Sequence, residues 1–511
     1  MEQTTSEPAR PGPETPESPT RCSAREMALL WMLGLALVLA VSRQSLWIDE
    51  ASTAASSSQG SLRDWWRKLL GIGGSDLQMP VYMLYVWGWV KVAGAGEWAL
   101  RAAGLIWLVP GLVAMASGFP RRAQRVALML VAATSAFAWY YAGEARPYAM
   151  QLGASCLIFA ALLRLGRDEL GDRGQSRWLS GFLFGFLALC GSSLLGVVWS
   201  IAALAAALIL IPRRRLLDLW KTGWPRLALT GLLLLLLGLY YLWTLSVGAR
   251  ASGVARTNWK TVVFVFYELF GFNGLGPGRI ELRQDGLQTL RPYILPLAGY
   301  CLLSATVVTI GVRQAMRLGS SKQVRALALA VAVPALLLLG AGFATHFRVL
   351  GRHFTPLLPI WFSLLALGMA ALWGGAGWMG RVTLTAWLLF GLYSCLSIRF
   401  AVRHQRDDYR DAAQYAKTAL GRNQVVWWNA DTEGARYYKV PLDTDGSGGK
   451  RAILTINPQA AFLASLKRPD AVIVSKPDIY DGAGALAEYL ARNHYQVCGK
   501  FPAFAIWLAA P

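Results

Sequence analysis

The sequence predicts an all-α polytopic membrane bundle that carries a small α/β domain at its C-terminal end. Of the 511 residues, 55% are hydrophobic and 15% are charged, whereas a soluble protein carries charge on about a quarter of its residues. Apolar runs of membrane length recur up to about residue 400, and each is long enough to cross a bilayer as a helix. Beyond that point short β-type runs alternate with helical patterns, which is typical of an α/β domain.

Eleven apolar runs define the expected membrane helices of a domain over residues 27–399. They lie near residues 27–42, 99–119, 123–142, 147–165, 178–190, 194–211, 226–246, 292–312, 325–344, 354–373 and 381–399. The long run 178–211 is divided at Gly191-Ser192-Ser193, because one helix of that length would exceed what a bilayer needs. The first run is as short as a signal peptide, but no small-residue cleavage pattern follows it, so we expect an uncleaved helix.

Charge predicts how the bundle is oriented. The formal net charge is +21, and the basic residues concentrate in loops near 121–125, 164–177, 213–226 and 313–325. The positive-inside rule places these loops in the cytoplasm, with the Pro- and Ser-rich, disordered segment 1–26. An odd number of spans then puts the C-terminal domain outside a bacterial-type inner membrane. Basic residues concentrated in such loops indicate contact with anionic lipid and argue against nucleic acid.

The first outer loop, residues 43–98, combines tryptophans with Arg and Lys, which predicts helices that lie in the membrane interface. Its run 79–92 leaves an alternative open: as a true short span it would break the topology above. The C-terminal domain, residues 400–511, has candidate strands at Val425–Trp428, Ala452–Thr455 and Ala471–Val474. Candidate helices at 409–420, 457–466 and 483–493 lie between or beside them, so we expect a largely parallel sheet.

Polar residues gather in the segments assigned to the outer side. They are Asp49, Glu50, Asp76, Gln78, Tyr82, Glu144, Arg146, Tyr148, His346, Arg348, Arg352 and His353. All lie at one membrane depth if the topology holds, so one interfacial cavity could contain them. Carboxylates there could act as a general base or hold a divalent metal, and arginines match phosphate oxygens. This set suits displacement at a sugar anomeric carbon with a lipid phosphate as the leaving group. The six cysteines include no CxxC pair, so no disulfide framework or thiolate zinc site is expected.

Three segments resemble a known family. They are LWIDEASTA at 46–54, YYAGEARPYAM at 140–150 and GRHFTPLLP at 351–359. They are similar to motifs of the lipid-carrier-dependent glycosyltransferases with the GT-C fold, in the protein O-mannosyltransferase and aminoarabinose-transferase superfamily (glycosyltransferase family 39-like). The resemblance covers roughly residues 27–400. It implies a membrane glycosyltransferase that uses a polyprenyl-phosphate sugar donor and a lipid, glycan or protein acceptor.

The resemblance also implies roles for particular residues. Asp49 would be the general base, with Glu50 supporting it or a metal, and Arg146 with Arg348 or Arg352 would bind the carrier phosphate. The remaining expected substrate contacts are Glu144, Tyr148, Gln78, Tyr82 and His353. One departure is that relatives often have His and Pro where this chain has Gln78 and Met79, which weakens any phosphate or metal contact expected there.

Other interpretations remain open from the sequence. The chain could be a transporter or flippase of lipid-linked sugars, or a membrane scaffold whose exported domain binds partners. Glu144 and Arg146 could form an ion pair that only anchors a turn, and Arg348 and Arg352 could be interfacial arginines that extend toward the headgroups. Apart from a divalent metal, the sequence points to no cofactor.

Overall fold

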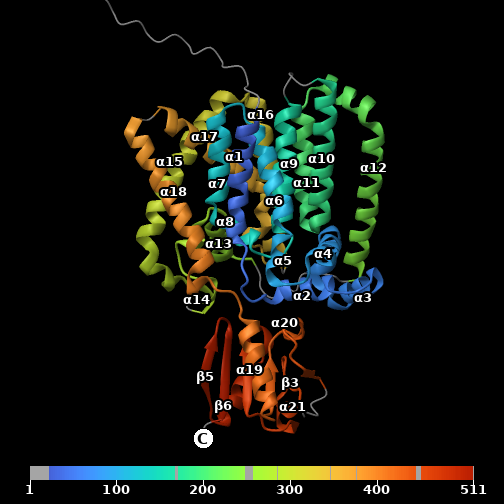
Figure 1. Cartoon of the computed structure of the whole chain (residues 1–511), viewed down its shortest axis with the longest axis vertical. Coiled ribbons are helices and arrows are strands. Elements are labelled where there is room, and N and C mark those ends of the chain that lie inside the picture. Colours follow the sequence, from blue (N-terminus) through green and yellow to red (C-terminus); the bar gives the residue numbers. More distant parts are fainter. Residues whose placement is uncertain are drawn as a thin grey trace, which may run out of the picture.

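The computed structural model describes residues 22–166, 171–247, 257–284, 286–345, 347–375, 377–444 and 450–509. Most of the predicted disordered N-terminus, residues 1–21, and His346 lie outside these ranges. Figure 1 shows a bundle of long helices with an α/β domain beyond one of its ends. The predicted fold class is confirmed.

Each of the eleven predicted apolar runs forms helix. The helices are α1 (Ala24–Leu35) with η1 (Ala36–Ala40), α5 (Glu97–Ala102) with α6 (Leu105–Ser117), α7 (Arg122–Ala133) with α8 (Ala136–Ala142), α9 (Tyr148–Leu165), α10 (Asp172–Ser192), α11 (Leu194–Leu210), α12 (Arg213–Ser246), α15 (Ile294–Leu318), α16 (Ser321–Ala344), η5 (Gly351–Leu357) with α17 (Leu358–Gly375), and α18 (Gly377–Phe400). Within the described ranges, seven helical segments are long and apolar enough to cross a membrane, or eight if α7 and α8, bent by 59°, form one span. The segments α1, α10 and α11 complete the predicted eleven but do not meet that criterion on their own.

The predicted break between α10 and α11 falls at Ser193. Its backbone is extended (φ −168°, ψ 158°) and its hydroxyl accepts a hydrogen bond from the Gly196 amide at 3.2 Å. Ser193 is therefore the N-cap of α11, and it also accepts a hydrogen bond from the Gln151 side chain at 2.9 Å. Nearby, α6 and α9 pack with their backbones almost touching: a Cβ at Gly153 would lie 2.1 Å from the Trp107 carbonyl oxygen.

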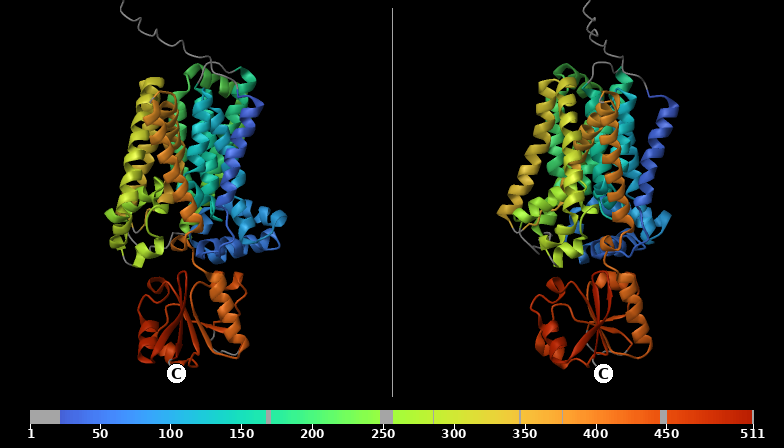
Figure 2. Two further views of the ribbon diagram at one scale, coloured as in Figure 1. Left: turned by 60° about the vertical axis from the view of Figure 1, so that its left-hand side comes forward. Right: turned by 90° about the vertical axis from the view of Figure 1, so that its left-hand side faces the viewer.

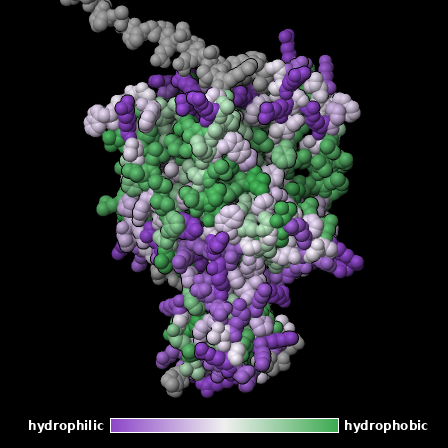
Figure 3. Space-filling model, in the orientation of Figure 1, coloured by the Kyte–Doolittle hydropathy of each residue, from purple (hydrophilic) through white to green (hydrophobic). Residues whose placement is uncertain are grey.

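Short helices gather at the end of the bundle that carries the α/β domain (Figures 1 and 2). They are α2 (Ile48–Ser57), α3 (Leu62–Ile72), η2 (Gly74–Gln78), α4 (Pro80–Ala93), α13 (Trp259–Leu269), η3 (Phe272–Gly274), α14 (Arg279–Gln284) and η4 (Gly286–Tyr293). Because the long helices run alternately in opposite directions, the arginine-rich turns from α6 to α7, α11 to α12 and α15 to α16 lie at the other end. Figure 3 shows hydrophobic surface around the middle of the bundle and hydrophilic surface at both ends.

The α/β domain is built on one six-stranded sheet in the order β2-β3-β1-β4-β6-β5. The strands are β1 (Val426–Asn429), β2 (Leu442–Asp443), β3 (Ala452–Leu454), β4 (Ala471–Ser475), β5 (Tyr495–Phe501) and β6 (Phe504–Ala509). The first four are parallel, with Trp427 opposite Val472 in the β1–β4 pair, while β6 and β5 add an antiparallel hairpin. The expected largely parallel sheet is present, and the hairpin is an addition that the sequence pattern did not indicate.

Helices cover both faces of this sheet. They are α19 (Tyr409–Gly421), α20 (Thr432–Tyr437), α21 (Ala460–Ser465), α22 (Pro477–Tyr480) and α23 (Ala485–Arg492), and η6 (Val402–His404) lies in the linker from α18. Residues of α19 and α20 pack with Trp428 in one core, whereas residues of α21 and α23 pack with Trp427 in the other. Adjacent residues of β1 thus point into opposite cores, as the alternation of a strand requires.

Candidate active site

The two acidic residues of the first motif occupy very different environments. Both lie in the first turn of α2, where the helix dipole favours negative charge. The Asp49 side chain is 29% exposed, but that of Glu50 is completely buried. Of these two neighbouring carboxylates, only that of Asp49 is accessible to a substrate.

Both oxygens of Glu50 are occupied by protein groups. Arg101 of α5 donates to them from Nε and Nη2, at 2.8 and 2.6 Å. Oε1 also accepts from the Ala145 amide at 2.9 Å and lies 3.2 Å from Nη1 of Arg406. Burial by itself would raise the pKa of Glu50, but the Arg101 and Arg406 charges and these hydrogen bonds outweigh it, so the pKa is lowered. Glu50 is thus a fixed anion that joins α2, α5, the turn at 145 and the linker after α18.

Asp49 faces arginines from two other motifs. Nη1 of Arg352, in η5, lies 3.5 Å from Oδ2 of Asp49. Nη1 of Arg146 donates to the Asp49 carbonyl oxygen at 3.2 Å. The guanidinium of Arg352 also lies over the rings of Trp47 and Tyr148, at 5.9 and 5.4 Å from their centroids. The structure therefore brings Asp49, Arg146, Tyr148 and Arg352 together from positions that are far apart in the sequence.

Arg146 is paired with Asp76, not with Glu144. Its Nη1 lies 2.8 Å from Oδ1 of Asp76 and 3.2 Å from the Thr53 hydroxyl. Burial raises the pKa of Asp76, and the neighbouring Arg146 only partly opposes this. The alternative in which a Glu144–Arg146 pair merely anchors the turn therefore does not describe this structure.

Glu144 is buried with little compensation. It is 1% exposed, and neither of its carboxylate oxygens accepts a hydrogen bond within the described residues. Nη1 of Arg406 lies 3.6 Å from Oε1 of Glu144. Burial raises the pKa of Glu144 against the opposing charges of Arg406 and Arg279. A buried carboxylate with free acceptor capacity is suited to hydroxyl or ammonium donors of a ligand.

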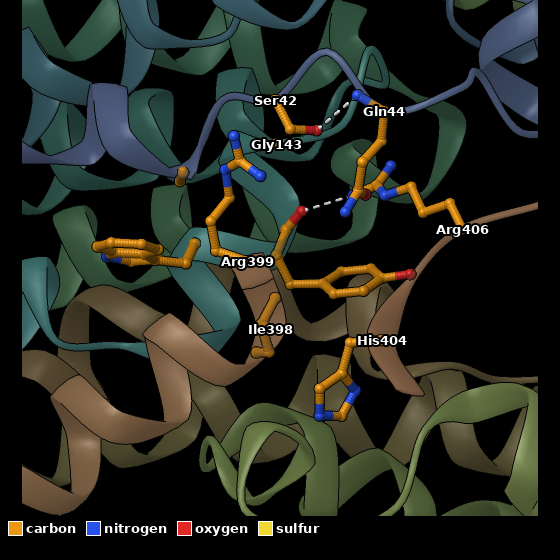
Figure 4. Close-up of a pocket in the computed structure, with 10 residues that line it drawn as sticks. Ser42, Gln44, Gly143, Ile398, Arg399, His404 and Arg406 are labelled. Carbon is orange, nitrogen blue, oxygen red and sulfur yellow. Dashed lines mark hydrogen bonds between the residues drawn. The ribbon is translucent and has the colours of Figure 1, made fainter. Parts of the chain in front are cut away.

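A small pocket that is open to solvent lies between η1, α8, the end of α18 and the linker, and Gly143, which precedes Glu144, lines it. Its lining includes Ser42, Gln44, Gly143, Arg399, His404 and Arg406 (Figure 4). Arg406 donates to the Tyr140 carbonyl oxygen at 3.1 Å, which holds its guanidinium at the pocket wall. The linker to the α/β domain therefore forms part of this wall.

The other residues predicted to contact substrate are Tyr82, Gln78, Arg348 and His353. Tyr82 is buried, Gln78 is half-buried in η2, and Arg348 is exposed. Nδ1 of His353 accepts a hydrogen bond from the Leu350 amide at 3.1 Å, and its ring stacks on Phe347. His353 therefore caps η5.

Two residues of the site were missing from the sequence prediction. Arg101 lies within the predicted second apolar run, and Arg406 lies in the linker. A charge inside an apolar run is itself a signal, because it requires a buried partner, and Glu50 is that partner. Among the described residues no three His, Cys, Asp or Glu side chains gather as metal ligands.

A multi-pass helical bundle with a carboxylate–arginine site at one end and a small α/β domain beyond it defines the class: the chain has the GT-C fold. Two solved structures of ArnT from Cupriavidus metallidurans share this fold. The one bound to undecaprenyl phosphate has a TM-score of 0.53 and 11% identity, over 96% of this chain and 100% of that chain. The apo structure has a TM-score of 0.54 and 12% identity, over 96% and 99%. No protein-family model and no curated protein matches the chain in sequence.

Proposed function

We propose that the protein is a membrane glycosyltransferase that moves a sugar from a polyprenyl-phosphate donor to an acceptor at the outer face of the membrane. The observation that carries this proposal is the pairing of a partly exposed carboxylate, Asp49, with the guanidinium of Arg352 at 3.5 Å. Catalysis of this transfer needs a base and an anion-binding group side by side. The fold shared with ArnT, whose structure holds undecaprenyl phosphate, supports the choice of a lipid phosphate.

The chemistry follows from these two groups. Asp49 takes the proton of an acceptor hydroxyl or amine, whose lone pair then attacks the anomeric carbon. The bond from that carbon to the phosphate oxygen breaks, and its electron pair leaves with the carrier phosphate. Arg352 is suited to bind this phosphate in its bidentate fork. Direct displacement of this kind inverts the anomeric configuration.

The other residues hold these groups in position. Arg146 is bound to Asp76 and to the α2 backbone, so it fixes Asp49 in place and adds positive charge behind it. Tyr148 lies beneath Arg352, and Glu144 offers unused acceptors to a sugar hydroxyl. We assign Glu50 a positioning role because both of its oxygens are already occupied.

The proposed side of the membrane follows from charge. The arginine-rich turns lie at the end of the bundle away from Asp49, and positively charged turns remain in the cytoplasm. Asp49 and the α/β domain would then face the outside of the inner membrane.

The test is transfer by the purified protein in liposomes, with a panel of undecaprenyl-phosphate-linked sugars and cell-envelope acceptors. Asp49→Asn preserves the shape of the side chain and removes the base, so transfer should fall by about 10²–10⁴-fold. Asp64→Asn, at an exposed aspartate of α3, is the matched control and should retain activity. Full activity of Asp49→Asn would refute the assignment, and movement of lipid-linked sugar across the membrane without transfer would favour a flippase.

A further inference from the structure

One edge of the sheet in the α/β domain faces the membrane bundle. Glu433, which follows β1, forms an ion pair with Lys68 of α3 at 2.8 Å. Lys476, which follows β4, places its ammonium group 6.0 Å from the centre of the Trp47 ring, two residues before Asp49. The carboxyl ends of these parallel strands are therefore turned toward the candidate active site.

This edge is where an open α/β sheet binds ligands. Such sheets bind them in the crevice outside the carboxyl ends of two neighbouring strands whose following helices lie on opposite faces. Here β1 and β4 are neighbours. The helix after β1, α20, packs on one face and α23, after β4, packs on the other. The crevice predicted by topology thus lies between Asp431 and Lys476.

Buried polar atoms concentrate at the same place. Asn429 ends β1, Thr455 follows β3 and Ser475 ends β4, and each is at most 1% exposed. Within the described residues, Oδ1 of Asn429 and the hydroxyls of Thr455 and Ser475 have no hydrogen-bond partner. Nε1 of Trp47 also has none among these residues. Unpaired buried polar atoms are uncommon in folded proteins. Three of these four lie at the carboxyl ends of β3, β1 and β4, and their unmet hydrogen-bonding capacity points to a polar ligand at this end of the sheet.

Lys476 is held in a strained conformation that brings it to this crevice. Its φ is +43°, in the left-handed region that residues with a Cβ avoid, and Pro477 follows it. Its ammonium group pairs with Asp407 of the linker. The Trp47 ring next to it also carries Arg352, so one tryptophan connects the crevice with the proposed phosphate-binding arginine.

We propose that this crevice binds a hydroxyl-rich carbohydrate group, with Asp431 accepting from its hydroxyls and Lys476 donating to them, so that the α/β domain selects the sugar presented to Asp49. This inference rests on the proposed function. A carboxylate, an ammonium group, unpaired hydroxyls and an indole are together suited to a polyhydroxylated ring. The carbohydrate is either the donor sugar or a glycan acceptor, since both must come close to Asp49.

The experiment measures binding to the full-length protein in lipid nanodiscs, so it does not depend on transfer. The probes are undecaprenyl phosphate, the same lipid carrying a panel of hexoses and pentoses, and oligosaccharides released from the producing cell's envelope. Asp431→Asn and Lys476→Met should each weaken binding of a sugar-bearing probe about tenfold, the worth of one hydrogen bond to a charged group. Binding of undecaprenyl phosphate itself should not change. Weaker binding of the sugar-bearing lipids would identify the carbohydrate as the donor sugar. Weaker binding of the released oligosaccharides would identify it as the acceptor.

Two sets of controls keep the test decisive. Glu488→Gln and Lys500→Met alter exposed groups of the same domain and should bind every probe as the wild type does. Glu433→Gln removes the ion pair to Lys68 and loosens the docking of the domain, but leaves the crevice intact. The proposal is overturned if Glu433→Gln reproduces the tenfold loss, if Asp431→Asn and Lys476→Met bind normally, or if the wild type binds no sugar-bearing probe better than undecaprenyl phosphate. Failure of the proposed function would instead be seen as transfer that survives Asp49→Asn.

Discussion

Replacement of Glu50 by Gln should reveal how strongly the buried carboxylate holds the site together. Arg101 is completely buried and has both Nε and Nη2 on Glu50. A neutral amide would leave that guanidinium, and part of the Arg406 charge, without a counter-ion in a low-dielectric environment. Removal of one partner of a buried ion pair costs about 3–5 kcal/mol of unfolding free energy. Since Gln keeps the volume and one acceptor, we expect the free energy of unfolding to fall by about 3 kcal/mol at pH 7.

The pH dependence has a definite sign. The pKa of Glu50 is lowered in the folded protein, so its stabilising contribution is complete above the ordinary glutamate pKa of about 4.3 and is lost as the pH falls through the folded-state pKa. The difference in the free energy of unfolding between the wild type and Glu50→Gln should therefore be constant at neutral pH and become smaller in acid. Denaturant unfolding in lipid micelles, followed by tryptophan fluorescence, measures it.

The matched control is Glu488→Gln, because Glu488 pairs with Arg492 at 2.5 Å but both side chains are more than half exposed. An exposed pair contributes little, so this variant should unfold like the wild type. A second change, Arg101→Gln in the Glu50→Gln background, should restore part of the loss because it removes the uncompensated charge. The reasoning is refuted if Glu50→Gln is as stable as the wild type, or if the second change adds a further full loss.

Three further outcomes are expected. Burial raises the pKa of Asp431 to about 6. Above that pH the buried charge lowers the free energy of unfolding by up to about 3 kcal/mol. Below about pH 4 the carboxyl group is protonated in both the folded and the unfolded chain, so this cost disappears. Asp431 is the N-cap of α20, where its Oδ2 accepts a hydrogen bond from the Gly434 amide at 2.8 Å, and Asn can keep this bond. Asp431→Asn should therefore be more stable than the wild type at pH 8 and equal to it at pH 4 by thermal unfolding. Gly153→Leu should destabilise the bundle by more than about 3 kcal/mol, since even a Cβ meets the Trp107 carbonyl oxygen, whereas Gly231→Leu, with open space around it, should not. Arg352→Lys should raise KM for the lipid donor about tenfold, because an ammonium group cannot form the bidentate fork, and an unchanged KM in transfer assays would remove Arg352 from the phosphate site.

The sequence predicted the helices well because membrane helices are set by long apolar runs, which depend little on distant residues. It also located the break at Ser193, where a polar side chain caps a helix. The antiparallel hairpin of β5 and β6 was missed because the edge strand β5, with exposed residues such as Gln496 and Lys500, has no clear alternation of apolar and polar positions. Its pairing with β4 is a tertiary contact that no local pattern encodes.

The site was only half visible in the sequence. Asp49, Arg146 and Arg352 could be grouped because each lies in an outer segment at one membrane depth. The different environments of Asp49 and Glu50 could not be predicted, since they depend on Arg101 and Arg406, whose approach requires the folded bundle. Likewise, the sequence identified the α/β domain but not which edge of its sheet faces the membrane, because no single strand determines how a domain docks.

The linker after α18 has a consequence for dissecting the two halves of the molecule. Arg406 belongs to that linker, yet its guanidinium lies against Glu50 and Glu144 inside the bundle. A chain cut directly after Phe400 would lose a buried cation as well as the α/β domain, and its inactivity would then have two causes. Only a cut placed beyond Asp407 separates the contribution of the α/β domain from damage to the membrane half.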